Sequence, residues 1–164
     1  MDKRGHVLNV VLLAIGVGYV LEPSVEEATF VAIAEVSMPL VLGALFPDVD
    51  TVFGDHRKTL HNLPVLGIFL GYPFFFGNLI FVWAGILSHY VLDVMGSKRG
   101  IALFYPVWRR EFGSPTGVTT SSTYSELVTI VITLVEIGVF ALFVHVLPGY
   151  LPPGLELGGV TAIR

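Results

Sequence analysis

The chain has 164 residues, of which 54% are hydrophobic and only 13% are charged. Soluble domains carry about 25% charged residues, so this deficit and the mean hydropathy of +0.78 indicate a membrane protein. The net charge of −4 argues against a nucleic-acid partner, since nucleic-acid-binding domains are usually basic. Cysteine is absent, which excludes disulfides and thiolate metal sites.

The apolar runs predict an all-α fold, a polytopic membrane helical bundle with about five transmembrane helices. A single helical membrane domain is expected over residues 1–150, followed by a flexible carboxyl-terminal tail over residues 151–164. The first run resembles a signal peptide, but no clear cleavage site follows it, so an uncleaved span is expected. The predicted spans are Val7–Leu21, Ser24–Leu45, Asn62–Phe76, Leu79–Met95 and Thr123–Leu147.

Helix boundaries follow from capping signals. Ser24 and Thr123 are each followed three residues later by Glu, which is the pattern of a capping box. Asn62 can cap the third helix. Crossing a bilayer takes about 20 residues, so the third and fourth spans are short, and a tight hairpin through Gly77-Asn78 is expected.

Glu35 lies in the middle of the second predicted span, four residues before Pro39. Proline removes the hydrogen bond to the carbonyl of Glu35, which predicts a kink. A charged Glu35 facing lipid would cost about 2.5–3.5 kcal/mol. Its side chain is therefore expected to face the bundle interior, to be protonated, or both. It would serve as a polar contact between helices or as a ligand or proton relay.

Histidine and aspartate are scarce, yet they gather in two places. Asp48, Asp50, His56 and His61 follow the second apolar run, in a predicted polar loop. His89 and Asp93 are four residues apart, so they share one face of a helix. Each pattern alone has a plain reading, a chance helical pair or a solvated helix end. Together they predict a metal site with ligands from the set His6, Asp48, Asp50, His56, His61, His89 and Asp93.

Loop charge supplies a partly independent argument. With the amino terminus in the cytoplasm, eight of the nine Lys and Arg residues fall in cytoplasmic segments, as the positive-inside rule requires. This orientation also places all seven candidate ligands at the cytoplasmic face. His145 falls at the opposite face and is read as an interfacial residue.

The ordered set of motifs resembles the YdjM-like family, described as membrane-bound metal-dependent hydrolases. It comprises Gly5-His6, the run Leu45 to Asp50, His56-Arg57 with His61, and His89 to Asp93 followed by Gly100, Leu103 and Pro106. That family usually shows His-Arg-x-x-Thr-His-Ser. Here one residue separates Thr59 from His61, and Asn62 stands where the family has Ser, which weakens a role for Thr59. The resemblance implies a helical membrane hydrolase, distantly similar to zinc-dependent phospholipase C enzymes.

These observations predict a membrane-bound metal-dependent hydrolase acting on an ester or phosphoester, with a lipid headgroup as one candidate substrate. The cofactor is a divalent metal, zinc first, with manganese or magnesium as alternatives, and one or two ions. Arg57 is assigned a catalytic role in steadying developing charge. The expected partner is membrane lipid and not nucleic acid.

Two alternatives stay open. The first is a non-enzymatic protein, either a metal-ion carrier whose path includes Glu35 and Glu136 or a metal-stabilised scaffold. The second concerns residues 96–122, where aromatic side chains lie between the basic pairs Lys98-Arg99 and Arg109-Arg110. This segment is read either as an interfacial anchoring belt or as a wall facing the substrate.

Overall fold

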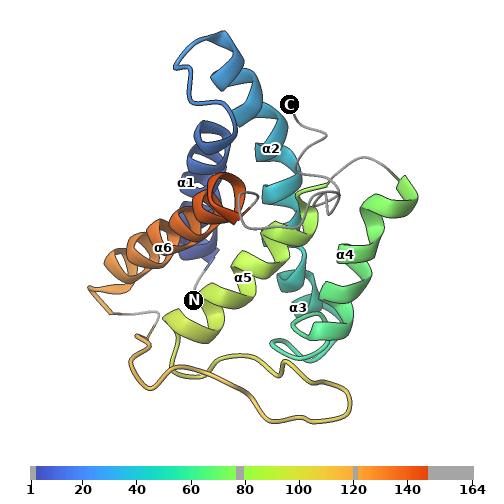
Figure 1. The fold of residues 1–164 in the computed structure, drawn as a ribbon. Coiled ribbons are helices and arrows are strands. Elements are labelled where there is room, and N and C mark those ends of the chain that lie inside the picture. The colour runs from blue at the N-terminus through green and yellow to red at the C-terminus, as the bar shows by residue number, and fades with distance from the viewer. Residues whose placement is uncertain (1–2, 77–79, 120–121, 148–164) are drawn as a thin grey trace.

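The computed structural model describes residues 3–76, 80–119 and 122–147, and these fold into a helical bundle (Figure 1). Within them lie five longer helices and two short ones, and the only β-type pairing is two isolated bridges between residues of the 97–118 loop. In chain order the elements are α1 (Lys3–Leu21), α2 (Glu27–Leu45), the 3₁₀ helix η1 (Pro47–Val49), α3 (Asp50–Phe53), α4 (Leu63–Phe76), α5 (Val82–Gly96) and α6 (Ser125–His145).

Helix α2 is at the centre of the bundle, packed against both α1 and α5, while α6 packs mainly on α1. Helix α4 stands at the edge, beside α5 (Figure 1). The main core joins α1 and α2 through buried aliphatic side chains that include Val10, Leu13, Val36 and Leu40. A second core, with Ile86 and Tyr90 of α5, lies under α4 and the 97–118 loop.

The α2–α5 crossing is very close because both helices present glycine there. A Cβ added to Gly43 would overlap the carbonyl oxygen of Val82, and one on Gly85 would overlap that of Leu40. Small residues allow helix backbones to approach in this way, as is common between membrane helices. The crossing fixes the register between Ala44 on α2 and His89 on α5, which matters for the site below.

Three stretches are long and apolar enough to cross a membrane, namely α1, residues 27–53 and α6, while α4 is a shorter apolar helix. Helix α6 is the most apolar of the three and also the least buried. Its exposed side chains include Leu127, Leu134, Val139 and Leu142. In water such a face would be unfavourable, so the arrangement fits contact with lipid.

Several sequence predictions about helix ends were wrong. Helix α2 begins after Glu26 with no side-chain cap, since the Thr29 hydroxyl accepts from the Val25 N–H and donates to the Glu22 carbonyl. Helix α6 likewise has no side-chain cap. The Asn62 cap is confirmed, because its Oδ1 accepts from the Val65 N–H at 3.0 Å.

Two other expectations need correction. The segment after α2 is not purely a loop, since it contains η1 and α3. The Glu35 side chain is exposed, so the prediction that it faces the interior was wrong. The buried face of α2 runs through Val36, Pro39, Leu40 and Gly43, and Glu35 lies outside it. The predicted turn at Gly77-Asn78 and the tail 151–164 lie outside the described residues.

Candidate metal centre

All seven predicted ligands gather at one end of the bundle, in a single connected cluster. His6 comes from the first turns of α1, Asp48 from η1, and Asp50 from the start of α3. His56 and His61 lie in the segment before α4, and His89 and Asp93 occupy neighbouring turns of α5. The inner members are almost fully buried, while Asp48 is 16% and His56 42% exposed, so these two mark the open side.

Asp50 is the polar anchor of the cluster. Its carboxylate, which is fully buried, accepts from His61 Nδ1 at 2.9 Å, from His56 Nδ1 at 3.0 Å and from the Leu60 N–H at 3.2 Å. Both carboxylate oxygens therefore accept hydrogen bonds, from the two ring Nδ1 atoms and from a backbone amide. Such a carboxylate fixes the tautomer of its histidine and raises the basicity of the opposite nitrogen. His61 is thus held with the Nε2 lone pair directed away from Asp50.

His89 is fixed by backbone instead. Its Nδ1–H donates to the carbonyl oxygen of Ala44 at 2.7 Å, a contact made possible by the close α2–α5 crossing. A carbonyl can only accept, so the proton of neutral His89 is on Nδ1 and its Nε2 carries a lone pair.

The two lone pairs face each other. His61 Nε2 and His89 Nε2 are 3.1 Å apart in a fully buried setting. Two acceptors at that distance repel unless a cation lies between or beside them, either a proton or a metal ion. The donor set therefore calls for a bound positive charge.

The spacing of the ligand atoms suits a metal ion. His61 Nε2, His89 Nε2, Asp48 Oδ1 and Asp93 Oδ2 are separated from one another by 3.1–3.8 Å over five of their six pairs. Zinc–nitrogen and zinc–oxygen distances of about 2.0–2.2 Å imply edges of about 3.3–3.6 Å for a tetrahedron of ligands. The residues present therefore have the chemistry and approximate spacing to hold a divalent cation.

A second group overlaps the first. The His6 ring stacks on His89 with centroids 3.8 Å apart, and its Nε2 lies 3.4 Å from Asp93 Oδ1. Among the described residues, buried His6 Nδ1 has no hydrogen-bond partner. Two triads of ligand atoms result, His6 with His89 and Asp93, and Asp48 with His56 and His61. The arrangement has enough ligands for one ion or two.

Arg57 ties the site to the 97–118 loop. Its guanidinium donates to the Gly100 carbonyl at 3.1 Å and to Ser97 Oγ at 3.4 Å, and its own carbonyl accepts from the Ala102 N–H. These contacts hold Arg57 at φ 69°. That left-handed region costs a non-glycine residue about 1–2 kcal/mol. The predicted catalytic arginine is thus engaged in fastening the loop.

The far part of this loop is closed by an exposed ion pair. Arg99 donates to both carboxylate oxygens of Glu111, at 2.7 and 3.1 Å. These hydrogen bonds lower the pKa of Glu111. In the same loop Trp108 stacks on Phe104 and is half exposed.

Sequence reasoning missed the groups that hold the ligands in place. The Ala44 carbonyl and the Leu60 amide are backbone atoms, which leave no residue-type signal. The Tyr90 hydroxyl donates to the Leu60 carbonyl and accepts from the Asn62 N–H, so it braces the segment that carries His61. In the sequence, only the position of Tyr90 next to His89 indicates that it could support the site.

A buried polar network lies next to the ligands. Asn9 Nδ2 donates to Thr133 Oγ1 and to Glu136 Oε2, and the Ser88 hydroxyl contacts Asn9 Oδ1 at 2.6 Å and Glu136 Oε2 at 3.0 Å. Asn9 is one turn from His6, and Ser88 precedes His89. The network links α1, α5 and α6 behind the cluster.

Fold and site together define an all-helical membrane protein with a histidine–carboxylate cluster, capable of holding a metal ion, at one end of its bundle. The chain belongs to the YdjM inner membrane protein family, whose model matches residues 1–152. No curated protein and no solved structure gives a significant match. The family confirms the resemblance seen in the motifs and the membrane location.

Proposed function

We propose that this protein is a metal-dependent hydrolase that cleaves an ester or phosphoester at the cytoplasmic face of the membrane. The observation that carries the proposal is the pair of facing Nε2 lone pairs of His61 and His89, flanked by two carboxylates at ligand spacing. Zinc is the first candidate because its tetrahedral preference matches this set of nitrogen and oxygen ligands. Manganese and magnesium are alternatives.

A bound divalent cation would supply Lewis-acid chemistry, lowering the pKa of a coordinated water and polarising the bond to be broken. His61, His89, Asp48 and Asp93 would hold it, and Asp50 would orient His61 from behind. Asp48 lies on the open side, where a substrate can enter. Hydrolysis adds water across the bond, so the acyl or phosphoryl group gains the hydroxyl and the leaving alcohol gains the proton.

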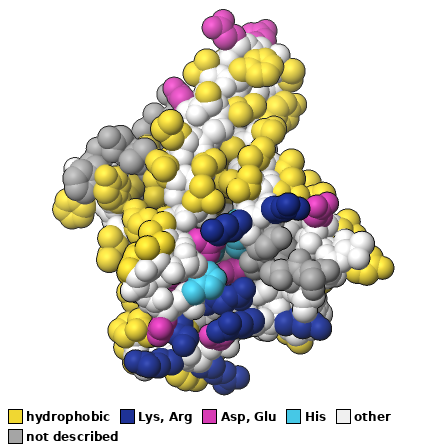
Figure 2. All heavy atoms as spheres, turned by 180° about the vertical axis from the view of Figure 1, so that it is seen from behind, with side chains coloured by type: hydrophobic (Ala, Val, Ile, Leu, Met, Phe, Trp, Pro, Cys, Tyr) yellow, Lys and Arg dark blue, Asp and Glu magenta, His cyan; other side chains and the backbone are white. Residues whose placement is uncertain are grey.

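Charge supports the orientation and an anionic substrate. Figure 2 shows histidine and carboxylate side chains in a recess of the surface, with lysine and arginine side chains on several sides. Basic residues favour the cytoplasmic side of a membrane, so this end would face the cytoplasm, with the amino terminus inside and about five spans. The same cations would attract a phosphate group.

Metal carriage is the weaker candidate. Carriers usually keep the ion site near the bilayer midplane, whereas this cluster lies at one end of α1 and α5. Glu35 is on an exposed face of α2 and so does not line a path from the cluster. The buried network around Glu136 favours metal transport, since it adds polar groups next to the candidate ligands.

The test is metal analysis of detergent-purified protein together with hydrolysis of a soluble phosphodiester. We expect the double variant His89→Ala, Asp93→Ala to lose the metal and the hydrolysis, since it removes two of four ligand atoms. His145→Ala is the matched control, because this histidine contacts the Val20 carbonyl at the other end of the bundle. Retained metal in a folded double variant would refute the proposal, and gel filtration with circular dichroism checks the fold.

A further inference from the structure

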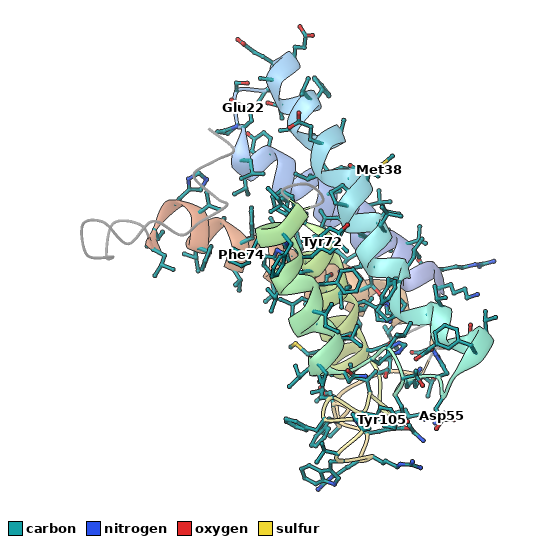
Figure 3. All side chains as sticks on the ribbon, turned by 90° about the vertical axis from the view of Figure 1, so that its right-hand side faces the viewer. Glu22, Met38, Asp55, Tyr72, Phe74 and Tyr105 are labelled. Atoms are coloured by element: carbon teal, nitrogen blue, oxygen red, sulfur yellow. The ribbon has the colours of Figure 1, made fainter. Side chains whose placement is uncertain are left out.

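An apolar groove lies between α2, η1 and α4. It has a volume of about 420 Å³ and is formed by Leu42 and Leu45 of α2, Val49 of η1, and Phe69 and Tyr72 of α4. Sites for small molecules commonly have volumes of about 300–1,000 Å³. In Figure 3, Tyr72 points from α4 toward α2, whereas Phe74 points away from the bundle.

The groove and the cluster both draw on the segment around η1. Phe46 and Val49 line it and flank Asp48 in sequence, while Asp48 Oδ1 lies 3.7 Å from His61 Nε2 and 3.8 Å from His89 Nε2. The element between groove and ligands is η1, which has three residues. The lining of the groove and a candidate ligand therefore come from the same short stretch of chain, Phe46 to Val49.

The two halves of this composite site have opposite chemistry. The groove walls are aliphatic and aromatic, and Figure 2 shows lysine and arginine side chains on several sides of the histidine and carboxylate side chains. An apolar slot takes a hydrocarbon chain, whereas a cationic rim with a bound metal takes an anionic group. The complementary molecule is an amphiphile with a phosphate head.

We propose that the groove between α2, η1 and α4 binds a hydrocarbon chain of an anionic membrane lipid and presents the lipid's phosphoester to the metal ligands. This inference rests on the proposed hydrolase function and names its substrate class. The groove borders residues 27–53, a stretch apolar enough to lie in the bilayer, so a lipid chain can enter without leaving the membrane. Burying a methylene group of the chain contributes about 0.8 kcal/mol where water is displaced.

The experiment compares two phosphodiester probes in detergent, p-nitrophenyl hexadecyl phosphate and p-nitrophenyl methyl phosphate. Leu42→Trp places a bulky ring in the groove, and Met38→Trp, one turn earlier on α2 and 68% exposed, is the matched control. We expect the parent protein to prefer the hexadecyl ester in kcat/KM. Leu42→Trp should lose that preference, with the larger change in KM, and Met38→Trp should keep it.

A second measurement does not depend on turnover. A phospholipid with a diazirine at the end of one acyl chain is reconstituted with the protein in nanodiscs and photolysed, and labelled peptides are located by mass spectrometry. Labelling of residues 42–49 and 69–72 that is lost in Leu42→Trp but kept in Met38→Trp supports the chain site. Equal preference for both esters, or labelling unchanged by Leu42→Trp, overturns it while leaving the hydrolase proposal standing. Labelling of the groove without hydrolysis of either ester would instead refute the hydrolase and retain the chain site.

Discussion

At the residue scale, the site depends on which nitrogen of each histidine carries its proton. The Nδ1–H of His61 donates to the Asp50 carboxylate, and the Nδ1–H of His89 donates to the Ala44 carbonyl. Both rings then direct Nε2 lone pairs to one point. The groups that orient these lone pairs toward a cation are therefore Asp50 and the Ala44 carbonyl, which hydrogen-bond the two histidines.

The substitution Asp50→Asn tests whether the Asp50 carboxylate orients His61. An amide offers one acceptor oxygen where the carboxylate offers two, so its NH₂ group would meet an N–H donor from either the His56 or the His61 side. We expect metal affinity to fall by about 10–100-fold, the usual effect of losing such a partner, with metal stoichiometry unchanged at saturation. Competition titration against a chelator measures this.

Asp55→Asn is the control, since that carboxylate is exposed in the same segment. Equal affinity in parent and Asp50→Asn proteins would contradict an orienting role. A lowered stoichiometry at saturating metal would instead indicate that Asp50 is itself a ligand, as the sequence analysis allowed.

At the element scale, the α2–α5 crossing determines whether the ligands meet. Gly85 is one turn before His89. Gly43 precedes Ala44, whose carbonyl accepts the hydrogen bond from His89 Nδ1. Separating the two helices would therefore move His89 relative to both Ala44 and Asp48. Stability and metal binding should depend on the same glycines.

Gly85→Ala should destabilise the protein by about 1–3 kcal/mol, as overpacking typically does. The added Cβ would overlap the Leu40 carbonyl and lie 2.8 Å from the Ala44 nitrogen. Thermal unfolding in detergent, with and without zinc, measures the loss and should show a reduced shift on metal addition.

Gly71→Ala in α4 is the matched control, since its Cβ would meet nothing within 4 Å. Alanine is favoured over glycine in a helix by about 0.5–1 kcal/mol, so this variant should be as stable as the parent or more so. A Gly85→Ala protein that melts like the Gly71→Ala protein would show that the crossing tolerates separation.

The packing of the helices separates what could be predicted from the sequence from what could not. The candidate ligands, which the structure brings together, stand out in the sequence because charge is rare in the chain, and the spacing of His89 and Asp93 follows from the helical repeat. Glu35 and Glu136 were not distinguishable, since both interrupt apolar helices. Only the rotation of each packed helix decides that Glu136 meets Asn9 and Ser88 while Glu35 is exposed. At the start of α2 the predicted capping box is replaced by the Thr29 hydroxyl, which accepts from the Val25 N–H and donates to the Glu22 carbonyl.

At the scale of the whole molecule, the basic side chains and the ligands share one end. All eight Lys and Arg residues of the described chain lie in α1's first turn, the segment before α4, or the 97–118 loop. Glu22 and Tyr105 mark the two opposite ends in Figure 3. The exposed apolar surface of α6 lies between these ends, so a bilayer around it would separate them.

The absence of cysteine makes this arrangement testable with single substitutions. Val107→Cys, at a residue 95% exposed in the loop, should react with a membrane-impermeant maleimide in inverted vesicles and not in right-side-out vesicles. Glu26→Cys, exposed at the start of α2, should show the opposite pattern, because the positive-inside rule places the basic end in the cytoplasm. The parent chain, which has no thiol, gives the background. Labelling of both positions from the same side would rule out the proposed topology, and reversed labelling would place the candidate metal centre outside the cytoplasm, with substrates drawn from the other leaflet.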